Sequence, residues 1–191
     1  MKASSLAEFL SLAKSTPTPL TYSSSGIGSG PHLAMVLFTQ TTGISLNHIP
    51  YKSVGLSIPD IIAGRIDSVL TTPLAAMPHV RTGKLRVLGV SSTARVPEIP
   101  GVPTLVEAGI AGFDVETWYM ALGPGKLPAA LAGKIQRDIA DALKDPAVAR
   151  VLEGDGATLV GSTPAQAASL LARDIARWSK VIQQAGVKPS E

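Results

Sequence analysis

Short apolar segments alternate with helical segments along the first half of the chain, and this alternation limits the folds that the chain can adopt. The apolar segments cover residues 20–23, 45–49, 66–70 and 85–90. Helical patterns follow the first three of them, at residues 31–42, 58–63 and 74–82. Strands that alternate with helices usually pair in parallel and are covered by those helices. The sequence therefore predicts an α/β fold built on a parallel sheet.

Longer helical patterns dominate the second half of the chain. Residues 93–113 are rich in proline and glycine, as a connector would be, and residues 115–122 have the composition of a strand. Apolar residues then recur with helical spacing over 128–144 and 164–185, and another helix is predicted at residues 5–15. With 191 residues, the chain is long enough to bury a sizeable core in one or two compact units.

A run of hydroxyls and glycines joins the first predicted strand to its helix. It reads Ser-Ser-Ser-Gly-Ile-Gly-Ser-Gly-Pro-His-Leu from Ser23 to Leu33. At such a junction the free N–H groups and the positive end of the helix dipole attract a carboxylate or a phosphate. Glycines allow a ligand to approach the main chain, and hydroxyls add donors. The candidate anion-binding residues are Ser24, Ser25, Gly26, Gly28 and Ser29, with His32 in the first helical turn as a further donor.

The same composition also suits a flexible connector that makes a turn and caps a helix, and turn chemistry alone supports this alternative equally well. The positions of the residues in this run exclude more specific nucleotide-binding and hydrolase motifs. A dinucleotide fingerprint needs a third glycine where Pro31 stands, and no Lys-Ser or Lys-Thr pair follows the glycines, as a Walker loop requires. A hydrolase nucleophile elbow is not expected either, because residues 23 and 27 are serine and isoleucine.

Two other predicted strands also end in polar residues. Lys52 follows residues 45–49, and Thr71 and Thr72 follow residues 66–70. Parallel α/β sheets place their ligand loops after the carboxyl ends of the strands, so Lys52 would complement an anion and the threonines would donate hydrogen bonds. Each residue also has a simpler interpretation, as a solvated lysine or as helix-capping threonines.

Composition narrows the classes of function. The chain has no cysteine, and its three histidines lack metal-ligand spacing, so we expect neither a metal site nor a cofactor. A net charge of +3 from scattered residues, with 4% aromatics, does not indicate nucleic-acid binding. No nucleophile with its base and no pair of catalytic acids can be identified, so an enzyme is not expected. No segment approaches the ~20 apolar residues of a membrane span.

Several stretches taken together resemble a known family. They are Tyr22–Leu33, His48–Lys52, Asp60–Asp67, Pro78–Ser92, Gly101–Gly109 and Trp178–Gly186. Their order and spacing, over essentially the whole chain, are similar to those of the TctC/Bug family, the periplasmic solute-binding receptors of tripartite tricarboxylate transporters. The resemblance implies a periplasmic-binding-protein-like fold of type II, the Venus flytrap. Its two lobes close on a small carboxylate, without catalysis, and a membrane permease receives the ligand.

The resemblance also implies roles for particular residues. In this family the serine and glycine loop grips a ligand carboxylate, which carries over to the six loop and helix residues identified above. The family commonly has an acidic residue where Thr71 stands and a glycine where Ser53 stands. A ligand ammonium group would therefore lose an obvious partner here, and the loop that carries Lys52 would differ in shape.

Length and lobe organisation depart from the family pattern. Residues 19–117 would form a complete lobe two, whereas residues 1–18 and 118–191 would form an incomplete lobe one. Family members carry further N-terminal residues, so we expect a truncated receptor whose helices 128–144 and 164–185 expose apolar faces. The alternative is a truncated interaction or dimerisation module with impaired ligand binding, in which a second copy covers these faces. The family implies the periplasm, but the first residues form no signal peptide, so a chain complete as given would be cytoplasmic.

Overall fold

The computed structural model describes residues 3–154 and 157–188. Contacts divide them into two compact units. One contains the described residues of Met1–Thr117 and Val181–Glu191, and the other is Trp118–Lys180 apart from residues 155–156.

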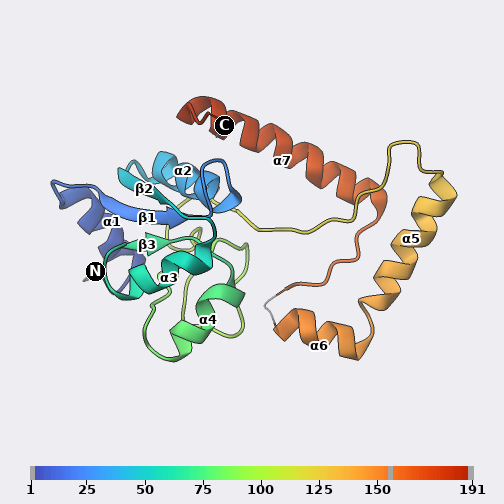
Figure 1. The fold of residues 1–191 in the computed structure, drawn as a ribbon, viewed down its shortest axis with the longest axis horizontal. Coiled ribbons are helices and arrows are strands. Elements are labelled where there is room, and N and C mark those ends of the chain that lie inside the picture. Colours follow the sequence, from blue (N-terminus) through green and yellow to red (C-terminus); the bar gives the residue numbers. More distant parts are fainter. Residues whose placement is uncertain (1–2, 155–156, 189–191) are drawn as a thin grey trace. The chain divides into compact units, whose positions relative to one another are not determined.

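The first unit is built on a three-stranded parallel sheet (Figure 1). Its strands lie in the order β2-β1-β3, and they are β1 (Leu20–Ser24), β2 (Leu46–Pro50) and β3 (Ser68–Val69). In the central strand, Ser24 is in register with Pro50 of β2, and Ser23 with Val69 of β3. The predicted α/β architecture is confirmed, with β3 shorter than the segment predicted for it.

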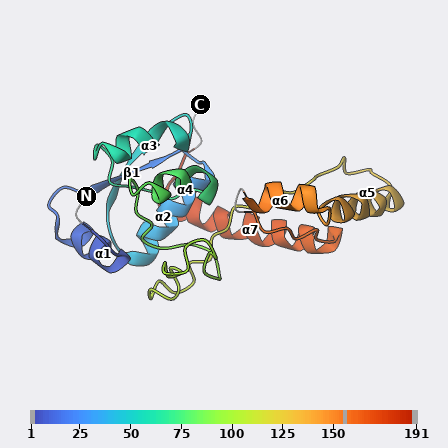
Figure 2. The same cartoon turned by 90° about the horizontal axis from the view of Figure 1, so that it is seen from below.

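Four helices surround this sheet. Helix α1 (Leu6–Ser15) precedes β1, and each strand is followed by a helix, namely α2 (Gly30–Thr42), α3 (Val54–Ile62) and α4 (Pro73–Arg81). Two views at right angles place α1 and α2 on one face of the sheet and α3 on the other (Figures 1 and 2). Parallel pairing requires such helical connections, because the chain must cross a face of the sheet before the next strand can begin in the same direction.

The core of the first unit lies between the sheet and helices α1 and α2. It contains the aromatic rings of Phe9, Tyr22, Phe38 and Phe113, all of them buried. The Phe38 ring centroid lies 6.4 Å from that of Phe9 and 5.8 Å from that of Phe113, which approaches edge-on. Burial of these rings supplies much of the apolar area that stabilises the unit.

Helix α1 belongs to this core, and it therefore lies in the first unit rather than with residues 118–180. The helix buries its apolar face, made by Leu6, Phe9 and Ala13, against the first unit. The described residues of Val181–Glu191 also join this unit, and its first segment ends at Thr117. How the units map onto receptor lobes stays a prediction.

Two predicted strands do not form. Residues 85–90 make one isolated bridge, in which Val90 N donates to Pro103 O and Leu105 N donates to Val90 O. Residues 115–122 make one backbone hydrogen bond outside their own segment, from Val115 N to Ser91 O at 3.1 Å. An apolar segment becomes a strand only where a neighbouring chain offers complementary N–H and C=O groups. In the described part of the chain these two segments have too few such neighbours.

The second unit is helical. It contains α5 (Ala129–Ala142), α6 (Pro146–Gly154) and most of α7 (Pro164–Ala185). Trp118 Nε1 donates to Asp174 Oδ2 at 2.6 Å, but none of the described residues of Trp118–Lys180 is buried. Leu131 and Ile175, for example, are 45% and 58% exposed. The predicted helices and the predicted exposure of their apolar faces are confirmed. Within the described ranges, no helix combines the length and the hydropathy that a membrane span needs.

Candidate functional site

The parallel sheet of the first unit brings three loops to one edge. Because β1 pairs in parallel with both neighbours, the carboxyl ends of all three strands lie together, and the N-termini of α2, α3 and α4 follow directly. All the predicted site residues are found at this edge or in the first turn of α2. They are Ser24, Ser25, Gly26, Gly28, Ser29 and His32 after β1, Lys52 after β2, and Thr71 and Thr72 after β3.

Ser25–Ser29, called the anion loop below, makes a tight turn between β1 and α2. Gly26 and Gly28 have φ angles of 116° and 78°, a region that residues with a side chain rarely adopt. Ser29 N donates to Gly26 O at 3.2 Å, and Ser29 Oγ donates to the same carbonyl at 2.7 Å. The glycines are therefore required by the backbone of the turn, and Ser29 holds it closed.

Ser24 supports the loop from below. Its side chain is fully buried, and its hydroxyl accepts a hydrogen bond from Gly26 N at 3.0 Å. The same hydroxyl shares a hydrogen bond of 2.6 Å with His48 Nε2. Direct contact between this hydroxyl and a ligand is therefore not expected, and the prediction for Ser24 changes from a ligand donor to a support of the loop.

Other polar groups at this edge are not engaged. Within residues 3–154 and 157–188, the structure assigns no hydrogen bond to the hydroxyls of Ser25, Thr71 or Thr72. The N–H groups of Ser25 and Ile27 likewise have no acceptor in the described chain. These groups are donors that an anion can use, since partially exposed loop donors otherwise bind water.

Ser29 differs from the other two residues that begin helices at this edge. Its hydroxyl accepts from His32 N at 3.4 Å and so caps α2. Ser53 and Thr72 occupy the cap positions of α3 and α4, but their side chains make no cap hydrogen bond. The helix-capping role considered for Thr72 is thus not seen in its side chain. Lys52 lies beside Ser53, is exposed, and forms no ion pair with a described carboxylate.

The charge of this edge favours anions. The anion loop and the connecting residues 51–53 and 70–72 contain one lysine and no carboxylate. The nearby Asp60 of α3 accepts from the Tyr51 hydroxyl and pairs with Arg65. The hydrogen bond from Tyr51 and then that from Arg65 lower the pKa of Asp60, so this carboxylate stays charged and paired. Asp67 accepts from Thr21 N at 2.8 Å and from Thr21 Oγ1 at 2.9 Å, which ties it to β1.

Two histidines that are distant in sequence stack beneath the anion loop. The rings of His32 and His48 lie 4.2 Å apart at 27°, and Tyr22 stacks on His48 at 4.9 Å. Gly28 N donates to His32 Nδ1 at 3.1 Å, so His32 contacts the loop directly. Burial lowers the pKa of His32, and burial followed by the charge of His32 lowers the pKa of His48 to about 4.

Sequence reasoning did not find the role of His48. The residue appeared as one of three scattered histidines, and only the pairing of Tyr22 with His48 across β1 and β2 brings it under the loop. A motif search has no signal for such a pair, because the register between two strands sets it. The described residues contain no cluster of three or more His, Asp or Glu side chains that would hold a metal ion.

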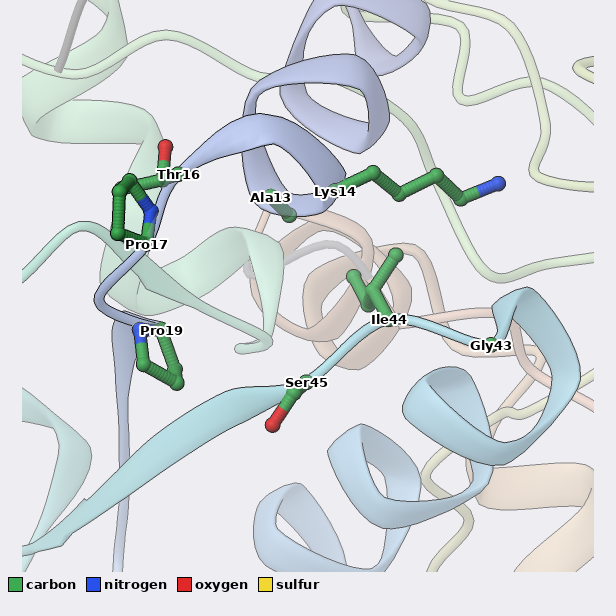
Figure 3. A pocket seen from close by; sticks show the side chains of 8 residues that line it. All are labelled: Ala13, Lys14, Thr16, Pro17, Pro19, Gly43, Ile44 and Ser45. Carbon is green, nitrogen blue, oxygen red and sulfur yellow. The ribbon is translucent and has the colours of Figure 1, made fainter.

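A pocket of about 340 Å³ lies away from this edge (Figure 3). It is lined by residues at the end of α1 and by residues that precede β1 and β2, including Lys14, Pro19 and Ser45. These positions belong to the amino ends of the strands, opposite the anion loop. Figure 3 shows the Lys14 side chain extending away from the hydroxyls of Thr16 and Ser45. The pocket therefore offers no converging set of polar groups.

The chain matches the family model described as the tripartite tricarboxylate transporter family receptor over residues 1–187. Protein BugT of Bordetella pertussis is 31% identical over 188 residues, which cover 98% of this chain and 58% of BugT. A protein from the tcbD-tcbE intergenic region of Pseudomonas sp. strain P51 is also 31% identical, over 93% of this chain and 53% of that protein. The chain thus spans a little over half the length of these relatives.

Solved structures share the fold. An R. palustris protein solved with adipate superposes with a TM-score of 0.86 at 29% identity, over all of this chain and 64% of that protein. MatC from Rhodopseudomonas palustris, solved with bound malate, gives a TM-score of 0.81 at 26% identity, over 93% of this chain and 62% of MatC. The periplasmic binding protein BugD has a TM-score of 0.84 at 23% identity, over all of this chain and 64% of BugD. The fold is accordingly that of a partial α/β periplasmic binding protein.

Proposed function

Since this chain belongs to the tripartite tricarboxylate transporter receptor family, we propose that it binds a small carboxylate at the carboxyl edge of β1, β2 and β3. The binding involves no catalytic step, and cleft closure on the ligand is its mechanism. Family members are periplasmic solute-binding receptors. The periplasm and a cognate membrane permease are therefore part of the proposal for the whole protein, of which residues 19–117 contain one ligand-binding lobe.

One observation carries this proposal: three loops and three helix N-termini converge on an edge that offers donors and one cation but no carboxylate. A carboxylate placed there would accept from the Ser25 hydroxyl and from the N–H groups of Ser25 and Ile27. Gly26 and Gly28 would let it approach the main chain. Lys52, Thr71 and Thr72 would contact the more distant part of the ligand from the neighbouring loops.

Adipate and malate are the ligands of two solved relatives, and they are the probes for this site. We expect each to raise the melting temperature of the chain in a concentration-dependent way. Ser25→Ala removes a hydroxyl that has no partner among the described residues, so it should weaken binding about tenfold or more without lowering the stability of the free chain. Isothermal titration calorimetry and thermal melting measure the two effects.

Ser45→Ala is the matched control, because Ser45 lies at the opposite edge of the sheet and its hydroxyl makes no hydrogen bond in the described chain. It should bind both ligands as the unchanged chain does. Flat melting curves and no heat of binding with either dicarboxylate would show that the chain by itself is not a carboxylate receptor.

A second function, pairing with another copy of the chain, is favoured by the exposed apolar ridge of α5. Leu131, Ile135 and Ile139 recur every four residues and each is more than 40% exposed. The helix also carries both charge signs, as the Lys134–Asp138 ion pair shows, so an antiparallel copy would meet opposite charges. We propose that α5 is the contact in such a dimer.

A further inference from the structure

We propose that His32 is a positioning residue for the anion loop and that only its neutral form holds the loop in its binding shape, so that anion affinity falls in mild acid. This inference rests on the proposed carboxylate function. It concerns two histidines that lie beneath the loop, and it assigns His32, which the sequence suggested as a donor to the anion, to the support of the loop instead.

The contact between His32 and the loop has a fixed direction. Gly28 N can only donate, so His32 Nδ1 must accept, and the ring must carry its proton on Nε2. A second proton would have to bind at Nδ1, where it would face the Gly28 N–H. Protonation of His32 therefore removes the hydrogen bond and replaces it with the repulsion of two donors. Gly28 would then move away from the ring.

The loop depends on this contact because Gly28 lies between its two fixed points. At one end Gly26 N donates to Ser24 Oγ, and at the other Ser29 donates to Gly26 O. Gly28 has a φ angle of 78°, and among the described residues His32 is the side chain that forms a hydrogen bond with it. His32 is thus the side chain that fixes the middle of the loop, beside the Ile27 N–H proposed to bind the anion.

Burial keeps His32 in its neutral form by lowering its pKa. The two rings stack at 4.2 Å, and the Tyr22 ring lies 4.9 Å from His48 and 6.4 Å from His32, so a charge on either imidazole would be poorly hydrated and would repel a charge on the other. The end of α7 lines a pocket together with Tyr22, and residues 181–185 of that helix contain no titratable side chain. The pair itself is held by β1, β2, α2 and the anion loop. Their titratable side chains are Tyr22, His32 and His48, and they contain no Asp, Glu, Lys or Arg. Besides burial, which is the larger cause, a charge on His32 lowers the pKa of His48.

Substitution of His32 separates this role from simple packing. Asparagine places its side-chain oxygen where Nδ1 stands, so His32→Asn keeps an acceptor for Gly28 N–H that does not titrate. Leucine keeps the bulk but has no acceptor. Calorimetric titration with malate at pH 7.5, 6.5, 5.5 and 5.0 should show affinity of the unchanged chain falling about tenfold per pH unit once the pH is below the pKa of His32.

The variants should diverge from this profile in opposite ways. His32→Asn should bind like the unchanged chain at pH 7.5 and lose less affinity in acid, and His32→Leu should bind weakly at every pH. Protonation of malate itself affects all proteins equally and cancels in the ratio. His79→Asn, on α4 and outside the stack, is the control and should follow the unchanged chain. Equal pH profiles for the unchanged chain and His32→Asn would overturn the proposal.

A measurement without ligand keeps the two proposals distinct. The Gly28 amide should exchange its hydrogen more rapidly, relative to other loop amides, as the pH falls in the unchanged chain, but not in His32→Asn. If malate and adipate bind to no variant at any pH, the carboxylate function fails while this amide still tests the positioning role. If the relative exchange of Gly28 is the same in both proteins across the pH range, the positioning role fails.

Discussion

At the scale of single residues, two buried serines show that the direction of a hydrogen bond determines how much stability is lost when either partner is removed. Ser23 Oγ donates to Ser57 Oγ at 2.8 Å, and Ser57 Oγ donates onward to Val54 O at 2.7 Å. Both side chains are fully buried between β1 and α3. Removal of Ser57 leaves the Ser23 hydroxyl without an acceptor, whereas removal of Ser23 leaves the Ser57 donor satisfied.

Ser57→Ala should therefore destabilise the chain more than Ser23→Ala does. We expect a loss of about 1–3 kcal/mol for Ser57→Ala, because a buried hydroxyl loses its partner, and a smaller loss for Ser23→Ala. Urea unfolding of both variants and of the double variant measures the difference and the coupling. An equal or larger loss for Ser23→Ala would contradict the assigned direction of the bond.

Single residues also mark the limit of prediction from the sequence. Gly26, Gly28 and Ser29 could be assigned to a turn before α2, because their types have specific backbone and capping uses. The burial of Ser24 and its contact with His48 could not be assigned. They depend on which strand lies beside β1 and in which register, and the residues of the loop do not carry that information.

At the scale of elements, the helices of the chain were more predictable than its strands. The apolar spacing of α5 and α7 depends only on the residues of each helix. The same holds for the caps of α2, which are Ser29 at its start and Gly43, with a φ of 68°, at its end. A strand depends on its neighbours instead. Residues 85–90 contain more aliphatic side chains than residues 20–23, but only the latter lie between two partners, β2 and β3.

The caps of α2 and α3 provide a test at this scale. Ser29→Ala removes a hydroxyl that accepts from His32 N and donates to Gly26 O, and we expect a loss of about 1 kcal/mol or more in the free energy of unfolding. Ser53→Ala, at the same position of α3, removes a hydroxyl with no cap hydrogen bond and should change stability little. Urea unfolding monitored by circular dichroism compares the two. Equal losses would mean that the Ser29 hydroxyl contributes no capping energy.

At the scale of the whole molecule, the two units differ in how much side-chain surface they bury. The first unit has an aromatic core around Phe38 and Phe113, whereas none of the described residues of Trp118–Lys180 is buried. Stability within one chain follows such differences, because segments with few buried contacts open at low free energy. The helices of the second unit should therefore be the first to open, unless another chain covers them.

Pairing through α5 would change this order, and hydrogen exchange measured over a range of chain concentrations can detect it. We expect α2 to exchange slowly at all concentrations, and α5 to become protected as the concentration rises and sedimentation equilibrium reports a dimer. Ile135→Lys places a charge on the apolar ridge and should abolish both effects, because a buried, unpaired charge opposes association. Val151→Lys is the control, since Val151 is 64% exposed on α6 and lies outside that ridge. A monomer at high concentration, with α5 exchanging rapidly throughout, would exclude the dimer and leave the apolar face of α5 open to water.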